Sequence, residues 1–170
     1  MVSTLAEELI AHRAIEFGSF TLASGAKSDY YIDIKTAVTR PHLLSAIAKE
    51  VAVTYQFDVV AGVAVGGVPL AVAVSLEAKK PYAIIRSATK DHGKKNPVIG
   101  EVYGKAVLLI EDVTTSGGSA LYGTETLRAA GAVIDRVVTV VDREQGAKEM
   151  LQKHGILLIP LVRVSELLNR

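Results

Sequence analysis

Residues 107–120 read Val107-Leu108-Leu109-Ile110-Glu111-Asp112-Val113-Thr114-Thr115-Ser116-Gly117-Gly118-Ser119-Ala120. An apolar run ends here in two acids, and a short loop of hydroxyl-bearing residues and glycines leads into a predicted helix. The loop and the start of the helix would present unpaired backbone N–H groups and the positive end of the helix dipole, which suit a phosphate group. Two carboxylates beside a phosphate indicate that the ligand also carries hydrogen-bond donors. The pattern therefore favours a ribose 5-phosphate.

Strands and helices alternate around this segment. Apolar runs predict strands at 59–65, 82–85, 106–110 and 133–141, and helical spacing predicts helices at 68–78 and 119–130. Further elements are predicted as helices at 5–17, 41–55 and 144–154, strands at 30–34 and 156–162, and a terminal turn at 165–169. This alternation, with nearly continuous apolar strands, predicts an α/β fold with a parallel sheet and right-handed crossovers.

The overall composition bounds the class of protein. The chain has 170 residues, 49% of them hydrophobic and 22% charged, which fits one soluble domain with a substantial core. A net charge of +1 gives no general attraction to nucleic acid or to an acidic membrane. The absence of cysteine excludes disulfides, thiolate catalysis and cysteine-based zinc sites. The N-terminus does not resemble a signal peptide, and we expect a cytoplasmic protein.

One uncharged run, 59–76, reaches the lower length limit for a membrane-spanning helix. Gly66, Gly67 and Pro69 interrupt it at its centre, where a broken helix would expose backbone polar groups to lipid. We interpret it as a buried strand, a glycine turn and a buried helix with Pro69 in its first turn.

The chain carries a family resemblance. It contains no G-x-x-x-x-G-K-[ST] P-loop, and no G-x-G-x-x-G follows a strand. Instead, 111–119 resembles the signature that binds phosphoribosyl pyrophosphate (PRPP) in the type I phosphoribosyltransferases. Three further segments resemble the orotate branch of that family: the hood segment 20–28, the long cationic catalytic loop beginning at 86–93, and the pair Asp142-Arg143.

This resemblance implies both a fold and an activity. The implied fold is a single α/β domain with a parallel-sheet, Rossmann-like core at about 41–150. A small hood, formed mainly by 1–40 plus the C-terminal segment, would accompany it. The implied reaction is the transfer of ribose 5-phosphate from PRPP to orotate, which gives orotidine 5'-phosphate and pyrophosphate in pyrimidine biosynthesis. Mg²⁺ is the implied cofactor, held mainly by the substrate, so no protein ligands to a metal are expected.

The resemblance also implies roles for individual positions. Lys90 and Asp112 would be catalytic, and Thr115 and Arg143 would contact orotate, bordered by the hood backbone at Tyr31 and Ile32. The implied PRPP-binding residues are Arg86, Lys90, His92, Glu111, Asp112, Val113, Thr114, Thr115, Ser116, Gly117, Gly118 and Ser119. A homodimer is implied, in which Lys90 and His92 reach the neighbouring subunit's site.

Three positions depart from the family pattern. Many bacterial members carry lysine where this chain has Ala23, Gly66 and Ser87, and Gly66-Gly67 stands in place of the family's pyrophosphate loop. Lys94 and Lys95 follow in the cationic loop, and we interpret them as solvated residues. What replaces the missing cations stays open.

Two other functions remain as alternatives. A purine-type phosphoribosyltransferase would share the fold, but a neutral purine gives no reason for the arginine fork of Arg143. A non-catalytic PRPP-sensing regulator would share the PRPP site. The intact Lys90-Asp91-His92 run and the near-neutral charge count against that alternative.

Overall fold

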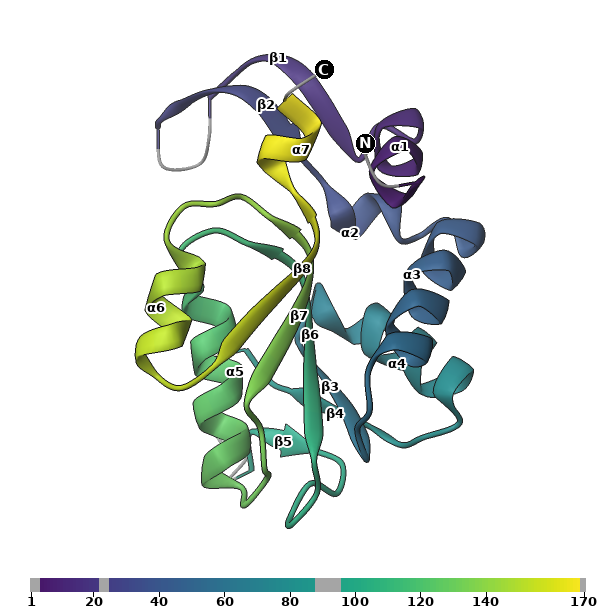
Figure 1. The fold of residues 1–170 in the computed structure, drawn as a ribbon, viewed down its shortest axis with the longest axis vertical. Helices are drawn as coiled ribbons and strands as arrows, with labels where there is room; N and C mark the ends of the chain where they lie inside the picture. Colours follow the sequence, from purple (N-terminus) through teal and green to yellow (C-terminus); the bar gives the residue numbers. More distant parts are fainter. Residues whose placement is uncertain (1–3, 22–24, 88–95, 169–170) are drawn as a thin grey trace.

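The computed structural model describes residues 4–21, 25–87 and 96–168. Within these residues, a six-stranded sheet has the order β5-β4-β3-β6-β7-β8 (Figure 1). Its strands are β3 (Val59–Val63), β4 (Tyr82–Ile85), β5 (Val98–Ile99), β6 (Val107–Thr114), β7 (Arg136–Asp142) and β8 (Leu157–Arg163). All neighbouring pairs are parallel except the edge pair β4 and β5. The predicted α/β class with a mainly parallel sheet is confirmed.

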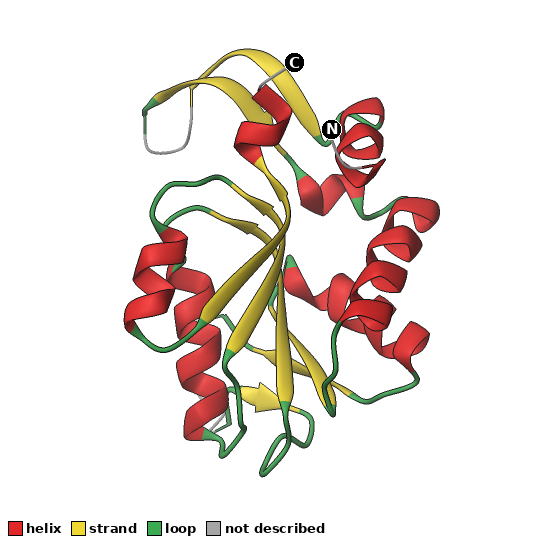
Figure 2. Ribbon diagram, viewed as in Figure 1, coloured by secondary structure: helices red, strands yellow, loops and turns green. Residues whose placement is uncertain are grey.

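Helices cover both faces of the sheet (Figure 2). On one face lie α3 (Pro41–Thr54) and α4 (Gly67–Ala78), and on the other lie α5 (Gly118–Ala129) and α6 (Ala147–Lys153). Side chains of β6 alternate between the two resulting cores: Leu108 and Ile110 pack in the first, whereas Val107 and Leu109 pack in the second. Burial on both faces explains why this strand is a continuous apolar run.

The strand order reverses direction between β3 and β6. The chain passes from β3 to its neighbour β4 on one side, and from β6 to its neighbour β7 on the other. In open α/β sheets, ligands bind at the carboxyl ends of the strands beside such a switch point. The loops that follow β3 and β6, which contain Gly66 and residues 115–117, flank this position.

The N-terminal elements lie beyond the carboxyl end of the sheet together with the C-terminal helix (Figure 1). They are α1 (Thr4–Ala11), the antiparallel hairpin of β1 (Ile15–Thr21) and β2 (Lys27–Ile32), and α2 (Ile34–Ala37), joined there by α7 (Val164–Leu168). Asp33 caps α2 by accepting hydrogen bonds from the backbone N–H and the hydroxyl of Thr36. No helix within the described residues is long and apolar enough to span a bilayer.

Several predicted element boundaries differ from the structure, and the two largest differences concern the end of the first helix and the end of β6. The first predicted helix was to run to Phe17, but α1 ends at Ala11 and Arg13 has a left-handed φ of 56°. Residues from Ile15 onward pair with β2 instead, so a tertiary pairing overrides the helical spacing. The strand predicted to end at Ile110 continues to Thr114, because β6 stays paired with β7 as far as Asp142.

Candidate active site

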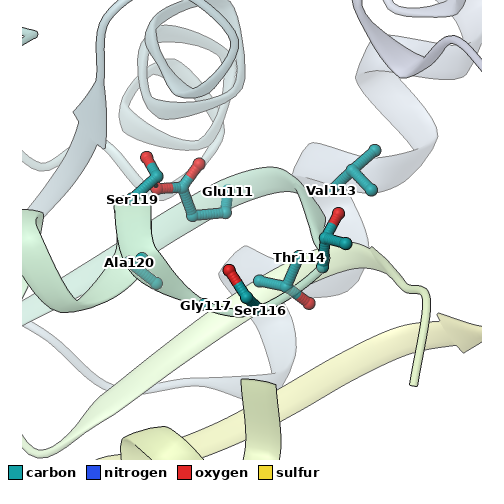
Figure 3. A pocket seen from close by; sticks show the side chains of 9 residues that line it. Glu111, Val113, Thr114, Ser116, Gly117, Ser119 and Ala120 are labelled. Atoms are coloured by element: carbon teal, nitrogen blue, oxygen red, sulfur yellow. Dashed lines mark hydrogen bonds between the residues drawn. The ribbon is translucent and has the colours of Figure 1, made fainter. Parts of the chain in front are cut away.

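A pocket of about 240 Å³ lies where β6 passes into α5. Its lining comprises Glu111, Val113, Thr114, Thr115, Ser116, Gly117, Gly118, Ser119 and Ala120 (Figure 3). Gly117 has a φ of 86°, and a Cβ there would lie 2.8 Å from the Met150 side chain, so the tight turn requires glycine. The turn aims the first N–H groups of α5 at the pocket, as an anion site needs. The structure therefore brings together all the loop residues that the sequence predicted.

Glu111 is the acid in the lining of this pocket and is 3% exposed. Its Oε1 accepts a hydrogen bond of 3.0 Å from the Ser119 hydroxyl, which lies beside it in Figure 3. Burial raises the pKa of Glu111 to about 7 from an ordinary value of 4.5, and the Ser119 bond opposes this only in part. Near neutral pH the carboxyl is thus partly protonated, which lowers its repulsion of a phosphate.

The raised pKa makes the stability of the ligand-free protein depend on pH. Between about pH 4.5 and 7 the folded state holds a proton on Glu111 that the unfolded chain releases. The free energy of unfolding therefore falls as the pH rises through this range. Glu111→Gln keeps a neutral group throughout. As the pH rises from 4.5 to 7.5, the free energy of unfolding of the variant should therefore increase by roughly 2–3 kcal/mol relative to that of the wild type. Urea unfolding across that pH range measures this difference. A gain that does not change with pH would contradict the raised pKa.

Asp112 faces the other side of β6 and is paired with a lysine that the sequence did not predict. The Lys35 Nζ atom of α2 lies 2.7 Å from Asp112 Oδ2, and Asp112 is 6% exposed. This hydrogen bond raises the pKa of Lys35. Gly66 lies against the same carboxylate, since a Cβ built there would approach Oδ2 to 2.4 Å. The charge of both acids beside residues 115–117 is therefore compensated, that of Glu111 by its raised pKa and that of Asp112 by an ammonium.

The end of β7 is locked to the end of β6. Asp142 Oδ1 accepts hydrogen bonds from the Thr114 hydroxyl at 3.1 Å and the Glu144 backbone N–H at 3.0 Å. The Arg143 backbone N–H donates to the Thr114 carbonyl at 2.9 Å. Asp142 therefore orients Arg143 by holding the backbone on either side of it. Among the described residues no hydrogen bond joins the Asp142 and Arg143 side chains, so this effect acts through the backbone.

The Arg143 side chain has a hydrogen-bond donor available for a ligand. Its Nε is buried, and no group in the described part of the chain accepts a hydrogen bond from it. The centre of its guanidinium lies 5.2 Å from the centroid of the Tyr30 ring in β2. A buried donor without a partner is costly, and a planar fork stacked on an aromatic ring suits a carboxylate ligand.

Tyr30 and Lys35 are the site residues that the sequence reasoning missed. Side chains of β2 alternate between half-buried and exposed, so Tyr30 turns towards Arg143 while Tyr31 is 46% exposed and packs on Phe20. A period of two in residues 27–32 could have indicated Tyr30. Lys35 offered no such signal, because its partner lies 77 residues away in the chain.

Arg86 follows β4 at the carboxyl edge of the sheet. Its backbone N–H donates to the Pro97 carbonyl at 2.9 Å, and its carbonyl accepts from the Tyr122 hydroxyl at 3.0 Å. These bonds fix the start of the cationic loop beside α5. The predicted contributions of Lys90 and His92, the neighbouring Lys94 and Lys95, and position 23 lie outside the described residues.

A parallel sheet with an acid pair, a hydroxyl-rich loop and a helix start at its switch point defines a phosphoribosyl transferase domain, and the model of that domain matches residues 33–156. Similarity to curated relatives identifies the branch of phosphoribosyltransferases. The chain is 66% identical to the orotate phosphoribosyltransferase of Methanocorpusculum labreanum and 62% identical to that of Methanoculleus marisnigri, with 99% of each chain covered in both cases. The chain belongs to the orotate phosphoribosyltransferase family.

Solved structures agree with this assignment. The orotate phosphoribosyltransferase of Aeropyrum pernix superposes with a TM-score of 0.84 at 29% identity, covering 97% of this chain and 96% of that one. The Mycobacterium tuberculosis enzyme in complex with PRPP superposes with a TM-score of 0.76 at 28% identity, covering 96% and 98%.

Proposed function

We propose that this chain transfers the ribose 5-phosphate group of PRPP to orotate, giving orotidine 5'-phosphate and pyrophosphate in pyrimidine biosynthesis. The observation that carries this proposal is the position of Arg143 and the unused hydrogen-bond donor of its side chain. Its buried Nε lacks a partner among the described residues, and its backbone is bonded to Thr114, which lines the phosphate pocket. An arginine fork beside a ribose-phosphate pocket fits a base that bears a carboxylate.

Different residues of the site would contact different parts of the two substrates. Residues 114–119 would hold the 5-phosphate through backbone N–H and hydroxyl groups, and Asp112 and Glu111 would meet the ribose hydroxyls. Thr115 is exposed at the pocket rim, where it would contact both phosphate and base. Arg86, with Lys90 and His92 of the cationic loop, would face the pyrophosphate. In this division, residues 1–40 and the C-terminal segment act as a hood over a core at about 41–150.

The reaction needs positioning more than a strong base. The bond between C1 of the ribose and the pyrophosphate oxygen breaks, the pyrophosphate leaves with the electron pair, and a ring nitrogen of orotate forms the new bond. The negative charge of orotate lies on its carboxylate, so the ring nitrogen loses its proton as the new bond forms. The departing pyrophosphate or water accepts this proton, and we assign no protein base. The protein aligns the two substrates and neutralises the leaving group, and closure of the cationic loop would exclude water.

We propose Mg²⁺ as the cofactor, carried in by PRPP. Within 4–21, 25–87 and 96–168, no three His, Asp or Glu side chains cluster as metal ligands. The ion would be held chiefly through substrate oxygens and water, as Mg²⁺ commonly is, with at most a carboxylate such as Asp112 nearby. When bound, the ion neutralises charge on the departing pyrophosphate.

Orotate consumption and PRPP binding by the purified protein test the proposal. Orotate should be consumed, with loss of its ultraviolet absorbance, only when PRPP and Mg²⁺ are both present, and EDTA should stop the reaction. Binding of PRPP without any consumption of orotate would favour the non-catalytic regulator instead.

We further propose a homodimer in which Lys90 serves the neighbouring subunit. Lys90→Ala and Arg143→Ala, each inactive alone, should complement each other when unfolded and refolded together. A mixed dimer would hold one site with both residues intact. Random mixing makes half of the dimers mixed, so activity should return to roughly a quarter of the wild-type value. If mixed dimers form and activity does not return, Lys90 acts within its own subunit.

A further inference from the structure

Lys35 and Gly66 meet at one oxygen of Asp112. The Lys35 ammonium lies 2.7 Å from Oδ2, and a Cβ built on Gly66 would lie 2.4 Å from the same atom. Because both distances end on Oδ2, the ammonium lies within their sum, about 5.1 Å, of the point where a side chain at position 66 would begin.

A lysine at position 66 would span a similar distance. Four single bonds of about 1.5 Å separate its Cβ from Nζ, which corresponds to roughly 5 Å in an extended chain. Lys35 therefore places its ammonium within the reach of a lysine at position 66, the residue that the family resemblance implies there for many bacterial members. Gly66 cannot acquire any side chain while Asp112 keeps its place, since a Cβ would overlap the carboxylate.

We propose that Lys35 is a PRPP-binding residue that contacts the pyrophosphate group and supplies, from α2, the cation absent from position 66. This inference rests on the proposed function. If Asp112 meets the ribose hydroxyls, a cation bonded to Asp112 lies close to the bond between C1 and the pyrophosphate. The charge would then stand where negative charge develops on the leaving group.

The state of the Lys35 side chain fits this role. It is 60% exposed, so a ligand can approach its ammonium. Among the described residues its hydrogen-bond partner is Asp112 alone, and an ammonium has three donors, so two remain for phosphate oxygens. The bond to Asp112 raises the pKa of Lys35, which keeps it cationic at neutral pH.

A purely structural role would leave a different signature. If Lys35 served only to neutralise the buried Asp112, its loss would weaken every ligand that contacts the ribose. If it binds the pyrophosphate, its loss would weaken PRPP but not ribose 5-phosphate, which has the same sugar and 5-phosphate and lacks the pyrophosphate.

Calorimetric titration without orotate separates these roles, because no turnover occurs. Lys35→Gln should bind PRPP about tenfold to a hundredfold more weakly than the wild type, with ribose 5-phosphate changed less than about twofold. Lys35→Arg should recover most of the PRPP affinity. Lys49→Gln removes an exposed lysine of α3 and should match the wild type. Equal losses for both ligands, or no loss for PRPP, would overturn the inference.

A double substitution covers the case in which Lys35→Gln destabilises the fold by leaving Asp112 unpaired. Lys35→Gln combined with Asp112→Asn removes both charges together. It should bind PRPP at least about tenfold more weakly than Asp112→Asn alone. Equal affinities would show that Lys35 acts only through Asp112. Failure of the wild type to bind PRPP would instead refute the proposed function.

Discussion

Asp112→Asn should lower kcat/KM for PRPP by about a hundredfold or more while the protein stays folded. The substitution keeps the shape of the side chain but replaces a carboxylate oxygen by an NH₂ group. Whichever oxygen is replaced, the side chain loses its negative charge. The hydrogen bonds to the ribose hydroxyls and the bond to the Lys35 ammonium, 2.7 Å from Oδ2, are therefore both weakened. Charged hydrogen bonds of this kind contribute about 1.5–3 kcal/mol each, and two of them exceed a factor of a hundred.

The measurement is steady-state kinetics with PRPP varied, together with thermal unfolding to verify the fold. Asp135→Asn is the matched control, because Asp135 is an exposed acid paired with Arg136 at the far end of the sheet. The control should keep wild-type kinetics. Normal PRPP kinetics in Asp112→Asn would show that the Asp112 carboxylate does not take part in PRPP use.

Arg143→Lys should damage the use of orotate far more than the use of PRPP. Lysine retains the charge, but it lacks the planar fork and the stacking on Tyr30, whose ring lies 5.2 Å from the guanidinium. We expect kcat/KM for orotate to fall by about a hundredfold, corresponding to roughly 3 kcal/mol, with the KM for PRPP changed less than about threefold.

Arg136→Lys provides the control at the opposite end of β7, because Arg136 begins that strand and pairs with the neighbouring Asp135 at the surface. Its kinetics should not change. If Arg143→Lys retains the wild-type KM and kcat for orotate, Arg143 does not recognise the carboxylate of the base.

The pocket where β6 passes into α5 could be predicted from the sequence because its determinants are local. An apolar run, the two acids that follow it in β6, and the glycine turn before α5 follow one another within residues 107–120, so chain order alone brings them together. The alternation of strands and helices likewise indicated the parallel sheet. Local order also placed Arg143 directly after β7, where the parallel neighbour β6 carries Thr114.

The remainder depends on contacts between distant segments. Lys35 reaches Asp112 because α2 lies with the other N-terminal elements beyond the carboxyl end of the sheet, and no spacing in the sequence encodes that approach. The first helix was predicted too long for a related reason. Ile15 and its neighbours carry a helical pattern, yet pairing with β2 stabilises them as a strand.

A competition among bases tests the central claim most directly. The purified protein is incubated with PRPP, Mg²⁺ and equal concentrations of orotate, adenine and hypoxanthine, and the nucleotide products are identified by mass spectrometry. The Arg143 fork predicts orotidine 5'-phosphate as the product, with pyrophosphate released in equal amount. Formation of adenosine or inosine monophosphate with orotate left unconsumed would contradict the assignment and indicate a purine-type enzyme.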